Sequence, residues 1–347
     1  MKRISLPLCI TSIKKFAFYS CKSLAQIIIP ISVKSIDEHA FSCCKSLTDI
    51  KIPFSVEEIE YGLFEDCSSL VNVSISPFTS YIQVCPFIGC ESLKKFTIPQ
   101  LVYCINTETF ADCTSLKEIS FPSSISAFDD FIDHSLDSFY IIDSGAFKNC
   151  TSLIEISIPS SITKIKCDAF KGCTSLKKVT IPSSVTSIGP SAFEDCTSLE
   201  EISLPSSIKK IKKDTFNSCK SLNQITIPSS VTLIDSNAFY DCKSLYELHF
   251  EEPSSLEKIG DSAFLCCENL YELIIPSSVK LIDTMAFMHC RSLSTVHSPP
   301  SVEIIGFYAF MRCKNIIDLK IYKGTSVNEE AFDDEHLPDR LDAYYRK

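Results

Sequence analysis

The sequence has no tryptophan, only 8 glycines in 347 residues, and no apolar run of membrane-spanning length. So few glycines exclude collagen-like and glycine-rich low-complexity chains, and a bilayer crossing needs about 18 consecutive apolar residues. Basic residues are also fewer than acidic ones: the 33 lysines and arginines and the 43 aspartates and glutamates give a net charge of −10. This balance argues against non-specific binding to nucleic acid or to an anionic membrane, both of which require basic faces.

The N-terminal segment MKRISLPLCI carries two bases but no sustained apolar stretch, so no signal peptide is predicted. Three interpretations stay open: a cytosolic chain, export by another route, or a fragment of a longer protein. The compartment is therefore uncertain from the sequence.

What the sequence does contain is a repeat of 23 residues, well represented by IPSSVTSIGPSAFEDC at 181–196. We number each unit from its cysteine, so that Cys173 is position 1, Ile181 is position 9 and Phe193 is position 21. A fixed period of this length predicts a solenoid, a propeller or an array. The phenylalanine of position 21 marks the register along the chain at Phe18, Phe41, Phe64, Phe87, Phe110, Phe147, Phe170, Phe193, Phe216, Phe239, Phe264, Phe287, Phe310 and Phe332.

Each unit predicts one coil of a parallel β-solenoid. Positions 7 and 9 are branched or aromatic between polar neighbours, which is the alternation of a half-buried strand. The proline at position 10 ends this strand, the serines after it form a turn, and positions 13 and 16 suit a second short extended pass. Ala-Phe at positions 20 and 21 predicts one helical or 3₁₀ turn. We expect the strands to stack as a parallel sheet on the concave face, with the helical turns on the convex face.

The unit C-x-x-L-x-x-I-x-I-P-x-S-[VI]-x-x-I-x-x-x-A-F-x-x-C resembles the BspA-type leucine-rich repeat, and the IPSSV and AFxxCxSL segments are most similar to its protist members. The resemblance implies a leucine-rich-repeat solenoid of the α/β class. It also implies a surface antigen that binds extracellular-matrix or host-cell proteins.

The repeat predicts a single domain over residues 1–332, of about fourteen coils, followed by a charged tail or cap at 333–347. Three departures interrupt it. The unit around 76–87 has its proline shifted by one residue, which predicts a distorted coil. Fourteen residues are inserted at 126–139, and Glu251 and Glu252 lengthen one turn. The first strand edge is exposed and could support self-association.

The 19 cysteines are interpreted as structural. Most occupy position 1, where stacked residues lie about 4.8 Å apart with parallel side chains, a poor geometry for disulfides. None of the cysteines forms a CxxC pair, so no zinc site is predicted. We therefore expect a buried ladder of free thiols.

One cluster on the sheet face is typical of a protein interface. It is defined by exposed tyrosines and acids on neighbouring coils, with two further acids at the rim. The alternative is an ordinary solvated sheet face. An acidic patch favours a basic partner surface. The members of this tyrosine–glutamate patch are Tyr246, Glu247, His249, Tyr271, Glu272, Glu251 and Glu252.

The insertion is a second candidate. Phe131 lies on its apolar side, and Asp129, Asp133 and Asp137 recur four residues apart. This spacing fits a short amphipathic helix docked on the solenoid, and a mobile acidic loop fits equally well. Calcium binding by these aspartates lacks the EF-hand order.

No order of serine, histidine and aspartate, no HExxH and no phosphate-binding loop is present, so neither catalysis nor a cofactor or metal is predicted. The favoured function is a non-enzymatic module that binds a protein partner through the concave sheet at the cell surface. The alternative is an intracellular adaptor that recruits a cytosolic partner.

Overall fold

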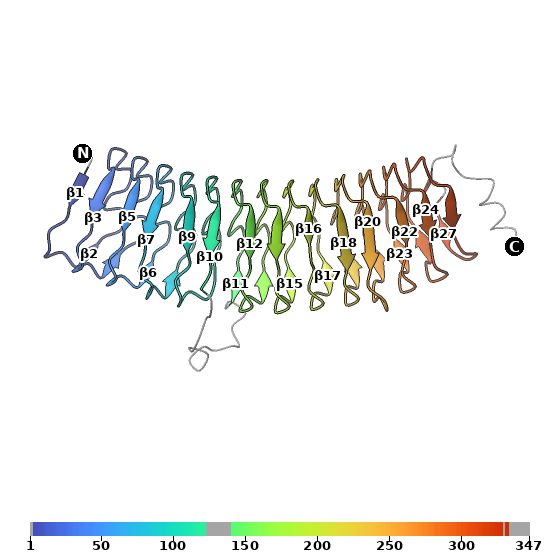
Figure 1. Ribbon diagram of the computed structural model, residues 1–347, viewed down its shortest axis with the longest axis horizontal. Coiled ribbons are helices and arrows are strands. Elements are labelled where there is room, and N and C mark those ends of the chain that lie inside the picture. Colours follow the sequence, from blue (N-terminus) through green and yellow to red (C-terminus); the bar gives the residue numbers. More distant parts are fainter. Residues whose placement is uncertain (1–2, 123–139, 329, 333–347) are drawn as a thin grey trace. The chain divides into compact units, whose positions relative to one another are not determined.

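The computed structural model describes residues 3–122, 140–328 and 330–332, and it is a parallel β-solenoid of about 13 turns (Figure 1). The predicted leucine-rich-repeat solenoid is thereby confirmed. The chain forms two compact units, Met1–Leu176 and Lys177–Lys347, called here the first and second units. The insertion at 126–139 and the tail at 333–347 lie outside the described residues, so their predictions stay untested.

Most coils contribute one strand before the proline, called here the long strand, and one two-residue short strand after the turn; the coil of β9 has an isolated bridge from Ile105 to Ile142 in place of its short strand. The strands of the first unit are β1 (Arg3–Ser5), β2 (Ser12–Ile13), β3 (Gln26–Ile28), β4 (Ser35–Ile36), β5 (Asp49–Lys51), β6 (Glu58–Ile59), β7 (Asn72–Ser74), β8 (Tyr81–Ile82), β9 (Lys95–Thr97), β10 (Glu118–Ser120), β11 (Ile141–Ile142), β12 (Glu155–Ser157) and β13 (Lys164–Ile165).

The second unit repeats this alternation. Its strands are β14 (Lys178–Thr180), β15 (Ser187–Ile188), β16 (Glu201–Ile202), β17 (Lys210–Ile211), β18 (Gln224–Ile227), β19 (Leu233–Ile234), β20 (Glu247–Phe250), β21 (Lys258–Ile259), β22 (Glu272–Ile274), β23 (Leu281–Ile282), β24 (Thr295–His297), β25 (Ile304–Ile305), β26 (Asp318–Lys320) and β27 (Ser326–Val327).

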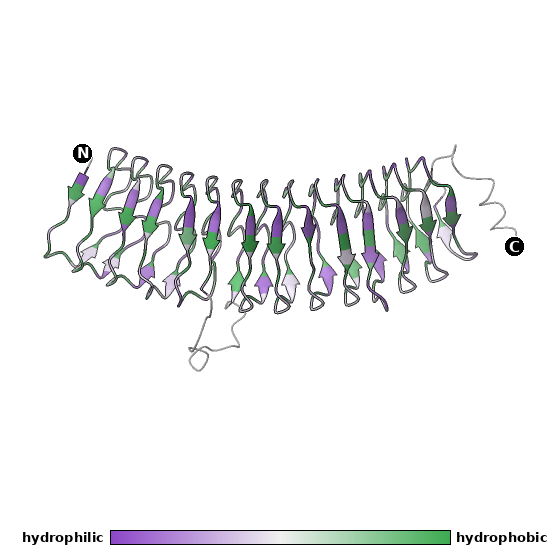
Figure 2. Ribbon diagram, viewed as in Figure 1, coloured by the Kyte–Doolittle hydropathy of each residue, from purple (hydrophilic) through white to green (hydrophobic). Residues whose placement is uncertain are grey.

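Residues one period apart are direct neighbours in the parallel ladders. Ile4 pairs with Ile27 in the first unit, and Val179 pairs with Ile202 in the second. Because side chains alternate along a strand, this register stacks apolar residues inward and polar residues outward. Figure 2 shows this alternation of hydrophobic and hydrophilic residues along the long strands.

Two columns of identical side chains fill the core. The phenylalanines of position 21 stack with ring centroids 5.0 to 5.8 Å apart. The thiols of position 1 donate to the phenylalanine carbonyl of the preceding coil, as Cys67 does to Phe41 at 3.1 Å and Cys219 to Phe193 at 3.2 Å. All the cysteines are free. Each thiol thus satisfies a buried carbonyl, which sulfur can do as a weak donor.

The segment around positions 20 and 21 differs from the prediction, because the described residues contain no helix. Positions 19 and 23 have positive φ in successive coils, for example His39 at 53° and Cys43 at 59°. A right-handed helix cannot continue through such residues. Alternate N–H groups instead bond to the next coil, as Phe41 does to the carbonyl of Leu63 at 3.1 Å. The N–H groups between them bond three residues back, as Ser42 does to His39 at 3.2 Å, so turn bonds alternate with bonds between coils.

Candidate binding surfaces

The tyrosine–glutamate patch lies on the long-strand face of the second unit. Tyr246 and Glu247 precede and begin β20, and Tyr271 and Glu272 do the same at β22. The two tyrosines occupy equivalent positions and are 47% and 61% exposed. Both occupy position 5, just before the strand. The repeat therefore presents two aromatic rings to solvent on adjacent coils.

A hollow of about 250 Å³ lies at the centre of the patch. Its lining includes the exposed Ile274, and the Nε2 atom of His249 lies 3.3 Å from Oε2 of Glu247. No lysine or arginine lines it, so its three glutamates give the hollow an acidic lining beside apolar side chains. β20 ends one ladder, which it forms with β18, and β22 begins the next, so the hollow lies where two ladders meet. The residues that line it are Tyr246, Glu247, Leu248, His249, Phe250, Glu252, Glu272 and Ile274.

The structure does not bring every predicted residue into that hollow. Glu251 faces the preceding coil, where its Oε2 atom accepts a hydrogen bond of 3.1 Å from the N–H of Ser229. It lines a separate groove of about 540 Å³ across β14, β16 and β18, together with Lys178 and Glu201. Glu252 stays with the patch, where its carboxylate accepts from the N–H of Ser254 at 3.0 Å. Tyr271 lies on the surface beside the hollow and does not line it.

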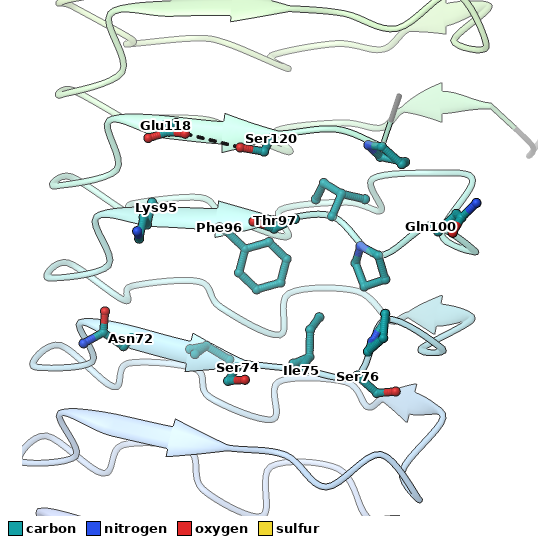
Figure 3. Close-up of a pocket in the computed structure, with 15 residues that line it drawn as sticks. Asn72, Ser74, Ile75, Ser76, Lys95, Phe96, Thr97, Gln100, Glu118 and Ser120 are labelled. Carbon is teal, nitrogen blue, oxygen red and sulfur yellow. Dashed lines mark hydrogen bonds between the residues drawn. The ribbon is translucent and has the colours of Figure 1, made fainter. Parts of the chain in front are cut away.

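A groove that the sequence did not assign as a site crosses β7, β9 and β10 in the first unit (Figure 3). It has a volume of about 540 Å³. Figure 3 shows Ser74, Thr97 and Ser120 in one row, each from a different strand. The hydroxyl of Ser120 donates to Oε1 of Glu118 at 3.3 Å. Hydroxyl and amide groups above half-buried apolar side chains can bind polar chain segments, such as peptide backbone.

The groove has a local cause. β7 pairs with β5 and β9 pairs with β10, and no ladder joins β7 to β9 among the described strands. Val73 and Ile75 are only half-buried, whereas their equivalents in the preceding coil are buried. Phe96 replaces the usual branched residue and packs against Phe87 and Phe110, with centroids 5.0 and 4.9 Å away. The oversized ring and the shifted Pro77 were the sequence signals for this distortion.

Burial keeps several of the ladder thiols protonated. Burial raises the pKa of Cys173 to about 12, and burial with the neighbouring Glu108 carboxylate raises that of Cys85 to about 12. A thiol is nucleophilic and binds metals only as thiolate. Within residues 3–122 and 140–328 no group of histidine, cysteine and acidic side chains is arranged to hold a metal. The predicted aspartates of the insertion, Asp129, Asp133 and Asp137, and Phe131 lie outside the described residues.

The comparisons with known proteins agree with this architecture. The sequence matches the family described as BspA type leucine rich repeat region, in six copies that together cover almost the whole chain, and the chain belongs to this family. No curated protein matches it significantly. Across the part of the chain that the structure describes, no helix has the length and hydropathy that a membrane crossing requires. The matched segments are 1–103, 80–141, 140–252 and 248–338.

Several solved structures have the same fold. A leucine-rich repeat protein from Bacteroides ovatus is 26% identical with a TM-score of 0.73, over 96% of this chain and 92% of that one. A leucine rich cell surface protein from Faecalibacterium prausnitzii is 22% identical with a TM-score of 0.54, over 100% and 91%. The pneumococcal vaccine antigen PcpA is 20% identical with a TM-score of 0.57, over 94% and 78%.

Proposed function

We propose that the chain is a non-enzymatic protein-binding module that takes its partner on the tyrosine–glutamate patch. The observation that supports this most directly is the pair of exposed rings, Tyr246 and Tyr271, beside a hollow with an acidic lining. Tyrosine gives a large, rigid contact area at a low cost in side-chain entropy. The apolar part of the lining, which includes Ile274, offers a contact for an anchoring side chain. The acidic part fits a partner with a basic surface.

The proposed setting is the cell surface, where the chain would act as an adhesion-type antigen. Its support is the likeness in fold to a protein described as a cell surface protein and to a vaccine antigen. The second candidate is an intracellular adaptor. The complete set of free cysteines favours it, because thiols stay reduced in the cytosol. Biotinylation of intact cells separates the two: labelling of the chain supports the surface role, and protection until lysis supports the adaptor.

The binding test is recovery of partners from host and matrix protein mixtures by immobilised chain. Tyr246→Ala combined with Tyr271→Ala should reduce recovery of a specific partner about tenfold or more, since each central aromatic contributes on the order of 1 to 2 kcal/mol. Tyr322→Ala is the matched control, because it removes an exposed tyrosine of the same unit outside the patch. Equal recovery of every partner by the double variant would reject the patch.

The contribution of the patch's negative charge to binding can be tested separately. Glu247→Gln with Glu272→Gln keeps the shape and removes two charges, so it should slow association with a basic partner and flatten its dependence on salt. Glu251→Gln is the control, because Glu251 faces another groove. An unchanged salt dependence in the first variant would contradict the proposed basic partner.

A further inference from the structure

Four lysines lie close together on one coil of the second unit, on the side of the short strands. One of them begins β17, and the other three lie within two residues of this strand. Three of the four are exposed, and the half-buried Lys212 donates from its Nζ atom to the hydroxyl of Ser187 at 2.9 Å. Lys209, Lys210, Lys212 and Lys213 are called here the lysine cluster.

The lysine cluster is mostly without acidic partners. Elsewhere in the second unit lysines form ion pairs, as Lys258 does with Asp283 at 2.7 Å. In the cluster only Lys213 has a carboxylate nearby, that of Asp214 at 3.9 Å, and within the described residues no ion pair forms at the other three lysines. Like charges this close repel one another. A bound anion would therefore lower the electrostatic free energy of this coil.

The coils on either side add hydroxyl groups and little charge. β17 pairs with β19 on one side, and Lys212 reaches the coil of β15 on the other. The equivalent segments 185–191, 208–214 and 231–237 contain four lysines and two aspartates, Asp214 and Asp235, a net charge of +2 in a chain whose net charge is −10. The hydroxyl groups beside the cluster belong to Thr186, Ser187, Thr232 and Ser236.

No exposed apolar side chain accompanies the lysine cluster. Ile208 and Ile211 are 1% and 2% exposed, and within residues 177–245 no large apolar side chain is exposed. The three segments also contain no aromatic residue and no arginine. A protein interface has an apolar core, attachment to a bilayer requires apolar side chains in its interfacial region, and single-stranded nucleic acid stacks its bases on aromatic rings. The surface therefore lacks what each of these three partners requires.

We propose that the lysine cluster binds a sulfated polysaccharide, whose sulfate groups pair with the ammonium groups of the lysines. Such a sugar chain presents fixed negative charges to the lysines and hydroxyl groups to the neighbouring serines and threonines, and it needs no apolar contact. A single narrow chain can follow one coil, whereas a nucleic-acid duplex would also cover the carboxylates of Asp214 and Asp235. This surface is separate from the tyrosine–glutamate patch, so either proposal can fail without the other.

The test is binding of the full chain to immobilised heparin, measured at low and at physiological salt. The wild type should bind, and more weakly as salt increases, because exposed charges are screened. Lys209→Gln with Lys210→Gln should weaken binding about tenfold or more, since each lysine near an anionic surface contributes on the order of 1 kcal/mol. Both side chains are exposed, so an unchanged circular dichroism spectrum is expected.

Lys220→Gln with Lys243→Gln is the matched control. It also removes two positive charges from the second unit, but both lysines already pair with Asp241, at 3.8 and 3.3 Å. Its binding should change less than about twofold. Absence of wild-type binding to heparin at physiological salt, or equal binding by the two double variants, would overturn the proposal.

Competition in solution identifies which anion the lysine cluster recognises. Free heparin should displace the wild type from immobilised heparin, whereas chemically desulfated heparin should not. Polyglutamate and single-stranded DNA present negative charges without sulfated sugar and should compete less well than heparin. Stronger competition by either of these two would overturn the proposal and assign the cluster to an acidic protein segment or to nucleic acid instead.

Discussion

The first and second units are built from the same coil, yet their surfaces differ. Inside, both carry stacked phenylalanines and thiols bonded to carbonyls. Outside, the first unit has exposed apolar side chains after its prolines and the groove across β7, β9 and β10, whereas the second has serine turns and the tyrosine–glutamate patch. An inward residue meets copies of itself above and below, so its identity is constrained. An outward residue is not, and there the units can acquire different partners.

The largest expected difference concerns alkaline pH. Burial raises the pKa of ladder thiols in both units, for example that of Cys173 to about 12 and that of Cys219 well above its ordinary value, and in the first unit it also raises the pKa of Cys85 and Cys104 to about 12. Below the ordinary thiol pKa near 9, folded and unfolded chains hold the same protons. Above it, the unfolded chain loses protons that the folded chain keeps, so stability falls as pH rises from about 9 to 12. Each thiol contributes about 1.4 kcal/mol per pH unit.

Urea unfolding at pH 7, 8, 9.5 and 10.5 measures this slope, and limited proteolysis shows which unit opens first. The first unit also buries Cys85 and Cys104, which lie outside the thiol ladder. Replacing both with alanine should therefore reduce the rate at which the free energy of unfolding falls with pH. Any stability that the two substitutions remove at pH 7 is measured separately. A stability that stays constant up to pH 10.5 would contradict the burial of these thiols.

Ile202→Asp should break the second unit locally. Ile202 is buried in β16, and an unpaired carboxylate there should cost about 5 kcal/mol. Ser203→Asp is the matched control, because the next residue points to solvent and should cost less than about 0.5 kcal/mol. Hydrogen exchange should show lost protection in neighbouring coils and retained protection in the first unit. Uniform loss along the chain would contradict coupling between nearest neighbours.

Phe64→Ala and Phe216→Ala test whether the two cores are equivalent. Each removes a fully buried ring stacked on both sides, at 5.8 and 5.6 Å for Phe64 and 5.6 and 5.2 Å for Phe216. Both should lose about 3 to 5 kcal/mol of the free energy of unfolding. A difference above about 1 kcal/mol, measured by urea denaturation, would show that the distorted coil of the first unit relaxes into the cavity.

The smallest effects concern position 19, where the backbone is left-handed in both units. Gly62 has a φ of 58°, and a Cβ there would clash with the Cε1 atom of the His39 ring, so Gly62→Ala should cost about 1 to 2 kcal/mol. Ser191 has a φ of 53°, and Ser191→Gly should gain up to about 1 kcal/mol. Thermal melting would measure the change in stability of both variants. A change in the same direction for the two would contradict the left-handed backbone at these positions.

The repeat predicted the solenoid, its register and the thiol ladder, because one period placed like residues in like surroundings. It also predicted the adjacency of Tyr246 and Tyr271. It did not predict that Glu251 lies outside the patch. Glu251 belongs to a turn with two added residues, and the direction of its side chain is fixed by the hydrogen bond from the N–H of Ser229, which the repeat does not reveal. The groove at β7 required knowledge of how Phe96 packs.

The sequence by itself determined which residues stack, since a period of 23 with alternating apolar residues allows one inward face. Only the tertiary structure decided the backbone of the Ala-Phe segment. Its left-handed positions hold residues as different as His39 and Met285, so no single residue type marked them. The physical reason is that those conformations are stabilised by hydrogen bonds to the next coil, which exist only once the coils have stacked.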